Sequence, residues 1–158
     1  MNRRVNVRGI ILDDNGSLFA VKHRMRDGSE AEYWATTGGG LDPGESLHDG
    51  LTREFIEELG VTPHIGKLLF IQQFIVQNNN GEKTEKLEFF FHIENKADFT
   101  DTIDLSTPSH GFELTRVAYI NPTENALLPT FLQTIDIKRY IDNDLPVYIL
   151  DNLQGNAR

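Results

Sequence analysis

The sequence predicts an α/β domain in which a mixed β-sheet lies between helices. Residues 47–59 carry apolar side chains at intervals of four, the spacing of a helix with one buried face. Several other segments have the pattern of strands bounded by turn residues. Strand-like and helix-like segments interleave irregularly along 158 residues, a length that suits one domain over residues 1–158.

Two strands are expected first, within residues 4–24, on either side of the turn Asp14-Asn15-Gly16. That turn is a strong hairpin signal, so the two strands are predicted to pair. Residues 25–33 are polar and are predicted to form a loop, followed by a short strand over residues 33–35.

A helix is predicted to begin after the glycine run at 38–40, because Ser46 suits an N-cap. Gly60 is a natural residue at which this helix ends. Four more strands and a late helix are then expected. Their order is a strand over 67–77, a strand over 86–94, a polar loop over 96–111, a strand over 112–120, a helix over 129–144 and a short strand over 146–150.

Composition limits the classes of function. The chain has no cysteine, which excludes disulfides, thiolate metal sites and a cysteine nucleophile, and fits a reducing compartment. No run approaches the ~18 apolar residues of a membrane helix, so no membrane partner is expected. A net charge of -9 argues against stable binding to nucleic acid. With no secretory signal in sight, we expect a cytoplasmic protein.

Glu54, Glu57 and Glu58 are predicted to share one helix face, because positions i, i+3 and i+4 have Cβ atoms roughly 5–6 Å apart. Each like-charged pair lowers helix stability by about 0.2–0.5 kcal/mol. A divalent cation makes the arrangement favourable, because the carboxylates become its ligands. An all-oxygen set favours Mg2+ or Mn2+, and Mg2+ takes substrate phosphates as further ligands. For three glutamates alone, a solvated acidic helix face is the simpler interpretation.

Arg53 adjoins this cluster, and its rigid donor fork can hold a carboxylate in a bidentate pair. Glu45, just before the helix, is the candidate partner. The glycines before it let the backbone approach a metal or phosphate closely. An acidic chain can therefore bind a polyphosphate through bridging cations.

The complete spacing decides between these interpretations. It reads Gly39, five residues, Glu45, seven residues, Arg53-Glu54, an apolar residue, any residue, Glu57-Glu58, any residue, Gly60 and apolar Val61. This is the full Nudix box over residues 39–61, and the chain resembles the Nudix hydrolases. Departures are local: Phe55 fills a slot that is more often aliphatic, Thr37 one that is often proline, and Gly50 costs a helix ~1 kcal/mol relative to alanine. A close contact would explain Gly50.

The resemblance implies an α/β/α sandwich that hydrolyses nucleoside diphosphates linked to another moiety, using Mg2+ or Mn2+. It assigns metal binding to Glu54, Glu57, Glu58 and the Gly38 carbonyl, and support of these carboxylates to Arg53 with Glu45. Glu54 or Glu57 is also a candidate to assist the attacking water. In some family members the base lies outside the box, where Glu85, Glu88 and Glu113 are alternatives here.

Candidate substrate-binding residues precede or follow the box. Arg8, Lys22 and Arg24 can meet phosphates, and scattered surface charge is an equally good interpretation of each. Trp34 can stack on a base, although a semi-buried tryptophan in the sheet is the commoner situation. Phe74, with Gln72 or Gln73, is a further candidate to line the pocket.

The leading hypothesis is a Mg2+-dependent enzyme that converts a nucleoside triphosphate, oxidised or not, to monophosphate and pyrophosphate. Cleavage of ADP-ribose or another nucleotide sugar is the alternative. A ligand sensor without turnover, an isoprenoid diphosphate isomerase and an RNA 5′-end pyrophosphohydrolase rank lower. The related isomerase chemistry relies on a cysteine, which this chain lacks. The expected partner is a nucleotide-like small molecule, and a homodimer is left open.

Overall fold

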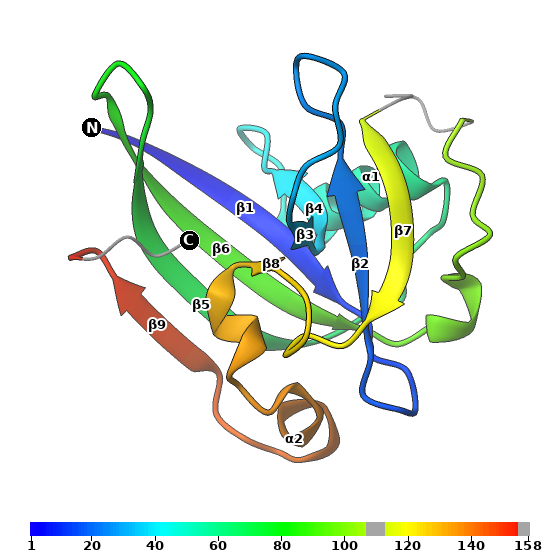
Figure 1. Cartoon of the computed structure of the whole chain (residues 1–158). Coiled ribbons are helices and arrows are strands. Elements are labelled where there is room, and N and C mark those ends of the chain that lie inside the picture. Colours follow the sequence, from blue (N-terminus) through cyan, green and yellow to red (C-terminus); the bar gives the residue numbers. More distant parts are fainter. Residues whose placement is uncertain (107–112, 155–158) are drawn as a thin grey trace.

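The computed structural model describes residues 1–106 and 113–154, and Figure 1 labels its elements. Five strands form one sheet in the order β4-β1-β6-β5-β9. In this sheet β1 pairs with β6 in parallel and β5 pairs with β6 antiparallel, so the sheet is mixed. Its strands are β1 (Asn2–Ile10), β4 (Thr37–Gly40), β5 (Ile65–Gln77), β6 (Lys83–Ile93) and β9 (Tyr148–Asn152).

Four strands form a second sheet in the order β7-β2-β3-β8. The pair β2·β7 is antiparallel and the pair β3·β8 is parallel. Only Thr36 separates β3 from β4, so the chain crosses between the sheets directly beside the glycine run. The strands of this sheet are β2 (Leu18–His23), β3 (Trp34–Ala35), β7 (Leu114–Ile120) and β8 (Leu127–Leu128).

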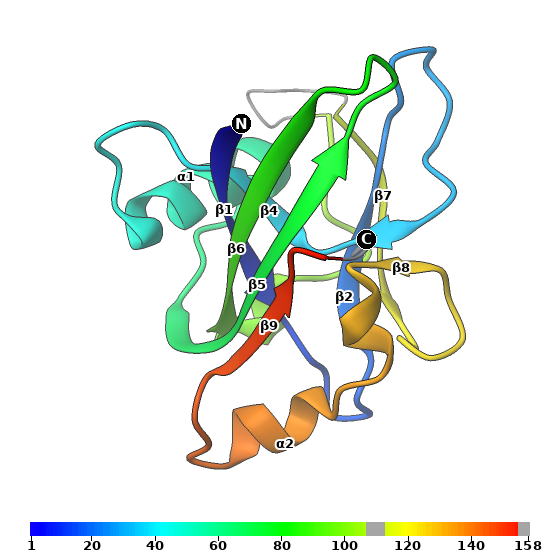
Figure 2. The ribbon, with the colours of Figure 1, turned by 90° about the vertical axis from the view of Figure 1, so that its left-hand side faces the viewer.

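The helices pack against different parts of the sheets. Figure 2 shows α1 and α2 on different sides of the strands. On β1, Val7 belongs to the core cluster that includes Phe55 of α1, whereas Ile10 belongs to the cluster that includes Ile137 of α2. Within residues 1–106 and 113–154, neither helix is long and apolar enough to span a bilayer. The helical segments are α1 (Leu47–Leu59), α2 (Ile137–Asp142) and two 3-10 turns, η1 (Lys96–Asp98) and η2 (Thr130–Gln133).

The predicted fold class, α/β with a mixed sheet between helices, is confirmed, but the strands divide into two sheets. The predicted hairpin over residues 4–24 is wrong beyond its turn. Asp13 Oδ1 accepts hydrogen bonds from the Asn15 and Ser17 amides, and the two arms meet only through the bridge from Leu12 to Leu18. Beyond that bridge, β1 pairs with β6 over its whole length, and this long-range pairing overrides the local one.

The predicted late helix over residues 129–144 is also wrong as one element. The chain forms η2, breaks, and starts again as α2, where the Asp136 carboxylate accepts a hydrogen bond from the Arg139 amide at 3.2 Å. An aspartate that caps a new helix competes with continuation of the preceding one. The strand predicted over 112–120 is β7, and of the polar loop predicted over 96–111 the last part, residues 107–111, lies outside the described residues. A single domain over residues 1–158 stays a prediction.

Candidate active site

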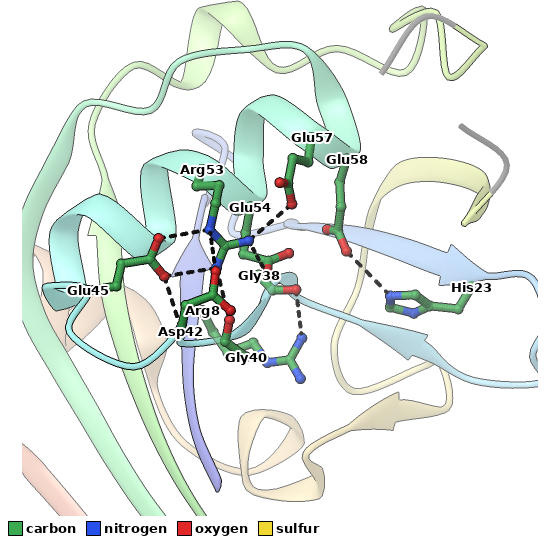
Figure 3. Close-up of polar contacts among 10 residues, drawn as sticks. All are labelled: Arg8, His23, Gly38, Gly40, Asp42, Glu45, Arg53, Glu54, Glu57 and Glu58. Atoms are coloured by element: carbon green, nitrogen blue, oxygen red, sulfur yellow. Dashed lines mark hydrogen bonds and ion pairs between the residues drawn. The ribbon is translucent and has the colours of Figure 1, made fainter. Parts of the chain in front are cut away.

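Helix α1 positions the acidic side chains of the site. Its first turn is capped by Ser46, whose Oγ accepts a hydrogen bond from the Asp49 amide at 3.1 Å. It ends at Gly60, which has the left-handed φ of 70° that favours glycine. The expected apolar stripe consists of Leu47, Leu51, Phe55 and Leu59, of which the last three are buried and Leu47 is partly buried. Figure 3 shows Glu54 beside the glycine run of β4 and Glu58 directed toward His23.

The two unusual residues of α1 both allow close packing. A Cβ atom on Gly50 would lie 2.3 Å from Leu41 Cδ1 and 2.9 Å from Glu45 Oε1, so glycine here lets Glu45 approach the helix. The ring of Phe55 packs on Gly9 of β1, where a Cβ atom would lie 2.4 Å from Phe55 Cζ. A close contact therefore explains Gly50, as the sequence suggested.

Arg53 ties the acidic cluster together. Its Nε and Nη2 donate to the two carboxylate oxygens of Glu45 at 2.8 and 2.9 Å, which is the bidentate pair that the spacing predicts. Its Nη1 donates to Glu54 at 3.0 Å and to Glu57 at 3.1 Å. Hydrogen bonds from Arg53 and from the backbone of Asp42 lower the pKa of Glu45 to about 2. One guanidinium thus holds three carboxylates in place (Figure 3).

Glu54 lies directly over the glycine run. A Cβ atom on Gly39 would lie 2.6 Å from both of its carboxylate oxygens, so any side chain at position 39 would displace it. Burial raises the pKa of Glu54, the hydrogen bond from Arg53 opposes this rise, and the charges on Glu58 and Glu57 add to it. Burial therefore favours the protonated form of Glu54.

Glu58 is a buried carboxylate, only 6% exposed. Its Oε1 lies 3.9 Å from Nε2 of His23 on β2. Its Oε2 is buried and accepts no hydrogen bond within residues 1–106 and 113–154. An unpartnered buried carboxylate oxygen is unfavourable unless a cation or donor is added.

The carbonyl of Gly38 reaches the same region from β4. Gly38 has a φ of 144°, and a Cβ atom there would lie 2.0 Å from the Val7 carbonyl oxygen, so only glycine fits. Arg8 Nη1 donates to the Gly38 carbonyl at 3.3 Å, and Arg8 Nε donates to Glu88 at 3.0 Å. Glu88 also accepts a hydrogen bond from Asn6 at 3.2 Å. Arg8 thereby links a carbonyl of the site to a buried carboxylate of β6.

A cavity of about 380 Å³ opens beside the glycine run. Its volume lies within the ~300–1,000 Å³ of small-molecule sites. Apolar walls come from Tyr33, Phe74, Val76, Leu128 and Pro129. Polar side chains come from β1, β2 and β6, namely Arg4, Asn6, Arg8, His23, Lys86 and Glu88.

Comparison with known families agrees with this geometry. The NUDIX domain matches residues 2–138, most of the chain. The chain belongs to the Nudix family. The predicted Nudix resemblance is thereby confirmed, and divalent metal ions are the general cofactors of Nudix hydrolases.

Individual relatives match over shorter stretches. The nucleoside triphosphatase NudI of Enterobacter sp. (strain 638) is 40% identical over 50 residues, 32% of this chain and 36% of the relative. NudI of Escherichia fergusonii is 40% identical over 62 residues, 38% of this chain and 42% of the relative. The match thus spans less than half the length of each NudI. The solution structure of the E. coli ORF135 protein has a TM-score of 0.64 at 20% identity, covering 92% of this chain and 96% of that chain, and shows the same fold.

The donors at the Nudix helix fit a hard divalent cation. Carboxylates and a backbone carbonyl are the oxygen ligands that such ions prefer, and the buried Oε2 of Glu58 lacks a partner that a cation would supply. In the described part of the chain, no three acidic or histidine side chains already converge on one point. The hydrogen bonds from Arg53 to Glu54 and Glu57 account for this spacing, because they direct both carboxylates toward the guanidinium.

Of the four predicted substrate-binding residues, Arg8 lines the cavity, whereas Lys22, Arg24 and Trp34 are not among the residues that line it. Lys22 Nζ lies 5.2 Å from the centroid of the Trp34 ring and 3.5 Å from Glu30. Trp34 is only 8% exposed, as expected of a tryptophan in the sheet. Phe74 lines the cavity, and Gln72 and Gln73 do not.

The three alternative bases occupy different surroundings. Glu88 faces the cavity but is engaged by Arg8 and Asn6. Glu85 accepts hydrogen bonds from Arg3 and Gln73 and does not line the cavity. Glu113 is exposed before β7. Glu88 is thus the alternative base that the structure brings beside the site.

Four of the six polar side chains that line the cavity from β1, β2 and β6 were not singled out from the sequence: Arg4, Asn6, His23 and Lys86. Arg4 and Asn6 alternate with Arg8 along β1, so a period of two starting from Arg8 would have found both. Lys86 joins them through the pairing of β1 with β6, which local sequence does not reveal.

Proposed function

We propose that this Nudix-family protein hydrolyses a diphosphate bond in a nucleoside diphosphate linked to another moiety, with Mg2+ as the cofactor and Mn2+ as a substitute. The preferred substrate is a nucleoside triphosphate, unmodified or oxidised, which gives monophosphate and pyrophosphate. One observation carries this proposal: the unpartnered, buried Glu58 oxygen lies in a carboxylate cluster next to Gly39 and His23, which line a cavity large enough for a nucleotide.

The roles of the side chains follow from their contacts. Glu54, Glu57, Glu58 and the Gly38 carbonyl hold the cation. When bound, the cation neutralises diphosphate charge, polarises phosphorus and lowers the pKa of a bound water. Arg53 keeps Glu54 and Glu57 oriented through its bidentate anchor on Glu45. Arg8, held by Glu88, presents a positive charge to the phosphates from the cavity side.

Glu54 is our choice for the proton acceptor, because burial raises its pKa. The water oxygen forms a bond to phosphorus while the bond from that phosphorus to the bridging oxygen breaks. The water proton passes to the Glu54 carboxylate, and the bridging oxygen leaves with the pyrophosphate. Positioning and electrostatic stabilisation supply most of the acceleration in such reactions.

The preference for triphosphates rests on the NudI relatives, which are nucleoside triphosphatases. The apolar walls around Phe74 suit a base, and the polar walls suit a charged chain. A nucleotide can therefore lie with its base against these apolar walls and its phosphates along the polar walls toward the Nudix helix.

A hydrolysis panel with Mg2+ and Mn2+ tests the proposal. It contains unmodified and 8-oxo nucleoside triphosphates, ADP-ribose, dinucleoside polyphosphates and triphosphorylated RNA. We expect metal-dependent turnover that is highest on a nucleoside triphosphate and is lost in both Glu57→Gln and Glu58→Gln. Highest turnover on ADP-ribose would show that nucleotide sugars, and not nucleoside triphosphates, are the preferred substrate class. Absence of turnover on every substrate, with nucleotide binding intact, would overturn the proposal of an enzyme and favour a ligand sensor.

A further inference from the structure

The cavity-facing side of β1 carries an unusual pairing of charges. Side chains alternate along a strand, so Arg4, Asn6 and Arg8 share the face that lines the cavity, whereas Arg3 lies on the opposite face. The register aligns Arg3 with Glu85, Asn6 with Glu88 and Arg4 with Lys86 on β6. The first two alignments bring a donor to a carboxylate, with an Arg3–Glu85 ion pair at 3.0 Å and an Asn6–Glu88 hydrogen bond at 3.2 Å. The third brings two cations together.

Such an alignment is unfavourable by itself, because like charges opposite each other destabilise a sheet. Within residues 1–106 and 113–154, no carboxylate forms an ion pair with Arg4, although the chain carries 24 acidic residues. An anion bound between Arg4 and Lys86 would make their alignment favourable, because it would attract both cations.

Gly40 fixes where the Arg4 guanidinium lies. A Cβ atom on Gly40 would be 2.6 Å from Arg4 Nη2 and 2.9 Å from Arg4 Nε, so the guanidinium rests on the backbone of β4. The carboxylate of Glu54 rests on the adjacent Gly39 in the same way. Consecutive Cα atoms are about 3.8 Å apart, so one short stretch of backbone supports both a carboxylate of the Nudix helix and the Arg4 cation.

The position of β4 makes both groups reachable by one ligand. Successive positions of a strand face opposite sides, so Glu54 and Arg4 approach β4 from its two faces. Because β4 is the outermost strand of its sheet, a flexible chain at its edge can contact groups on both faces. A polyphosphate has the length, flexibility and charge for this path.

We propose that Arg4 and Lys86 form a subsite for the terminal phosphate of a nucleoside triphosphate, next to the diphosphate held at the Nudix helix. This inference rests on the proposed function and deepens it, because the subsite favours triphosphates over nucleoside diphosphates and over ADP-ribose, which carries a sugar instead of a third phosphate. Arg4 contributes directional, charge-assisted donors, and Lys86 contributes a second positive charge.

Steady-state kinetics on Arg4→Gln and Arg3→Gln provide the first test. Both variants remove one positive charge from the same strand, but only Arg4 faces the cavity. We expect Arg4→Gln to raise the KM for a triphosphate roughly tenfold or more, as for loss of one charge-assisted contact, with kcat changed less than about twofold. The KM for the matching diphosphate, and both constants of Arg3→Gln, should stay near wild type. An equal KM change in the two variants would overturn the subsite.

Binding of inorganic tripolyphosphate, measured by calorimetry with Ca2+ present, gives a readout that does not depend on turnover. We expect Arg4→Gln to weaken binding and Arg3→Gln to leave it unchanged, with a smaller difference for pyrophosphate. If the wild-type protein hydrolyses no nucleotide, the proposed function fails, and this measurement still decides the subsite. Equal affinity of the two variants for tripolyphosphate, or no binding by the wild type, would overturn it.

Gly40→Ala tests the placement of Arg4 without removing its charge. The added methyl group displaces the guanidinium, so this variant should weaken triphosphate binding in the same way as Arg4→Gln. The double variant should be hardly weaker than Arg4→Gln, because residues that act through one contact are not additive. Full additivity would contradict a subsite built on this contact.

Discussion

The acidic end of the site, on α1, and the basic end, on β1 and β6, each place like charges side by side, but they are neutralised differently. At the acidic end, Arg53 contacts Glu45, Glu54 and Glu57. At the basic end, Glu88 binds Arg8, and no described carboxylate pairs with Arg4. Arg53 therefore orders the carboxylates of the acidic end, whereas at the basic end no described carboxylate orients Arg4.

This difference implies that the two ends affect different steps of the reaction. Carboxylates that Arg53 orders and that would hold a cation should act on the chemical step, because their geometry governs the transition state. A cation such as Arg4, which pairs with no described carboxylate, should contribute to binding, in ground state and transition state alike. Variants at the acidic end should therefore lower kcat, and variants at the basic end should raise KM.

The largest effect is expected from Glu57→Gln, which removes one charge from the acidic end and preserves its shape. Loss of one preorganised electrostatic group lowers kcat by roughly 10²–10³, and we expect a decrease of that order with a small change in KM. Steady-state kinetics on the best substrate of the panel measure it. Asp49→Asn, an exposed change on the same helix, is the control. Retention of more than a tenth of wild-type kcat by Glu57→Gln would contradict a role in the chemical step.

Gly39→Ala should have the next largest effect. The new methyl group would lie 2.6 Å from both carboxylate oxygens of Glu54, so the carboxylate must move. We expect a loss of roughly 10- to 100-fold in kcat/KM, as for loss of a group that orients a metal ligand.

Gly66→Ala is a matched control for this change. It places a methyl group 2.6 Å from the carboxylate of Glu94, which does not line the cavity beside the Nudix helix. Its activity should stay near wild type. If both alanine variants lose activity equally, damage to the fold would explain the effect better than displacement of Glu54.

The pair of Arg53 and Glu45 should appear in acid unfolding of the metal-free protein. Contacts with Arg53 and the Asp42 backbone lower the pKa of Glu45 from 4.5 to about 2. A carboxyl whose pKa is lower in the folded state stabilises the fold above its unfolded pKa and loses that contribution as pH falls through the folded pKa. The stabilisation from Glu45 is thus complete above about pH 4.5 and disappears toward about pH 2.

Arg53→Gln should flatten this pH dependence, because the main cause of the lowered pKa is removed. Urea unfolding of both proteins between pH 2 and pH 5, without metal, measures it. Arg26→Gln, which removes an exposed arginine of a loop, should keep the wild-type slope. Parallel curves for wild type and Arg53→Gln would show that the bidentate pair does not control Glu45.

The smallest effect is expected from Lys22→Met. Lys22 contacts the Trp34 ring and Glu30 and does not line the cavity, so KM should change less than about twofold. Loss of the cation–π contact should lower the free energy of unfolding by about 0.5–1 kcal/mol. Kinetics and urea unfolding measure the two effects. A tenfold rise in KM would indicate that Lys22 contacts the phosphates. It would weaken the assignment of the basic end to β1 and β6.

The sequence predicts the acidic end well, because a contiguous segment builds it. Helical periodicity places Glu54, Glu57 and Glu58 together, and Glu45 lies close enough in the chain for Arg53 to reach. The caps Ser46 and Gly60 follow local rules that single residues obey. Local rules also explain why the turn at Asp14-Asn15-Gly16 was predicted correctly.

The basic end could be predicted only in part, because the contacts of β1 with β6 depend on pairing between distant strands. Asn6 and Glu88 are 82 positions apart and meet only because β1 pairs with β6 in parallel. The hairpin signal of the first turn pointed instead to pairing of β1 with β2, since a local turn carries no information on long-range partners. The sequence placed Lys22 and Trp34 near the substrate, because the contacts of Lys22 with Trp34 and with Glu30 are visible only in three dimensions.

The central claim is that the carboxylates of the Nudix helix hold a divalent cation beside the cavity. Titration of Mn2+ into the nucleotide-free protein, followed by the relaxation of water protons, tests it most directly, with wild type and Glu58→Gln compared side by side. We predict that wild type binds Mn2+ and that Glu58→Gln, still folded by circular dichroism, binds it at least ~10-fold more weakly. Equal affinity of the two proteins for Mn2+ would contradict the claim.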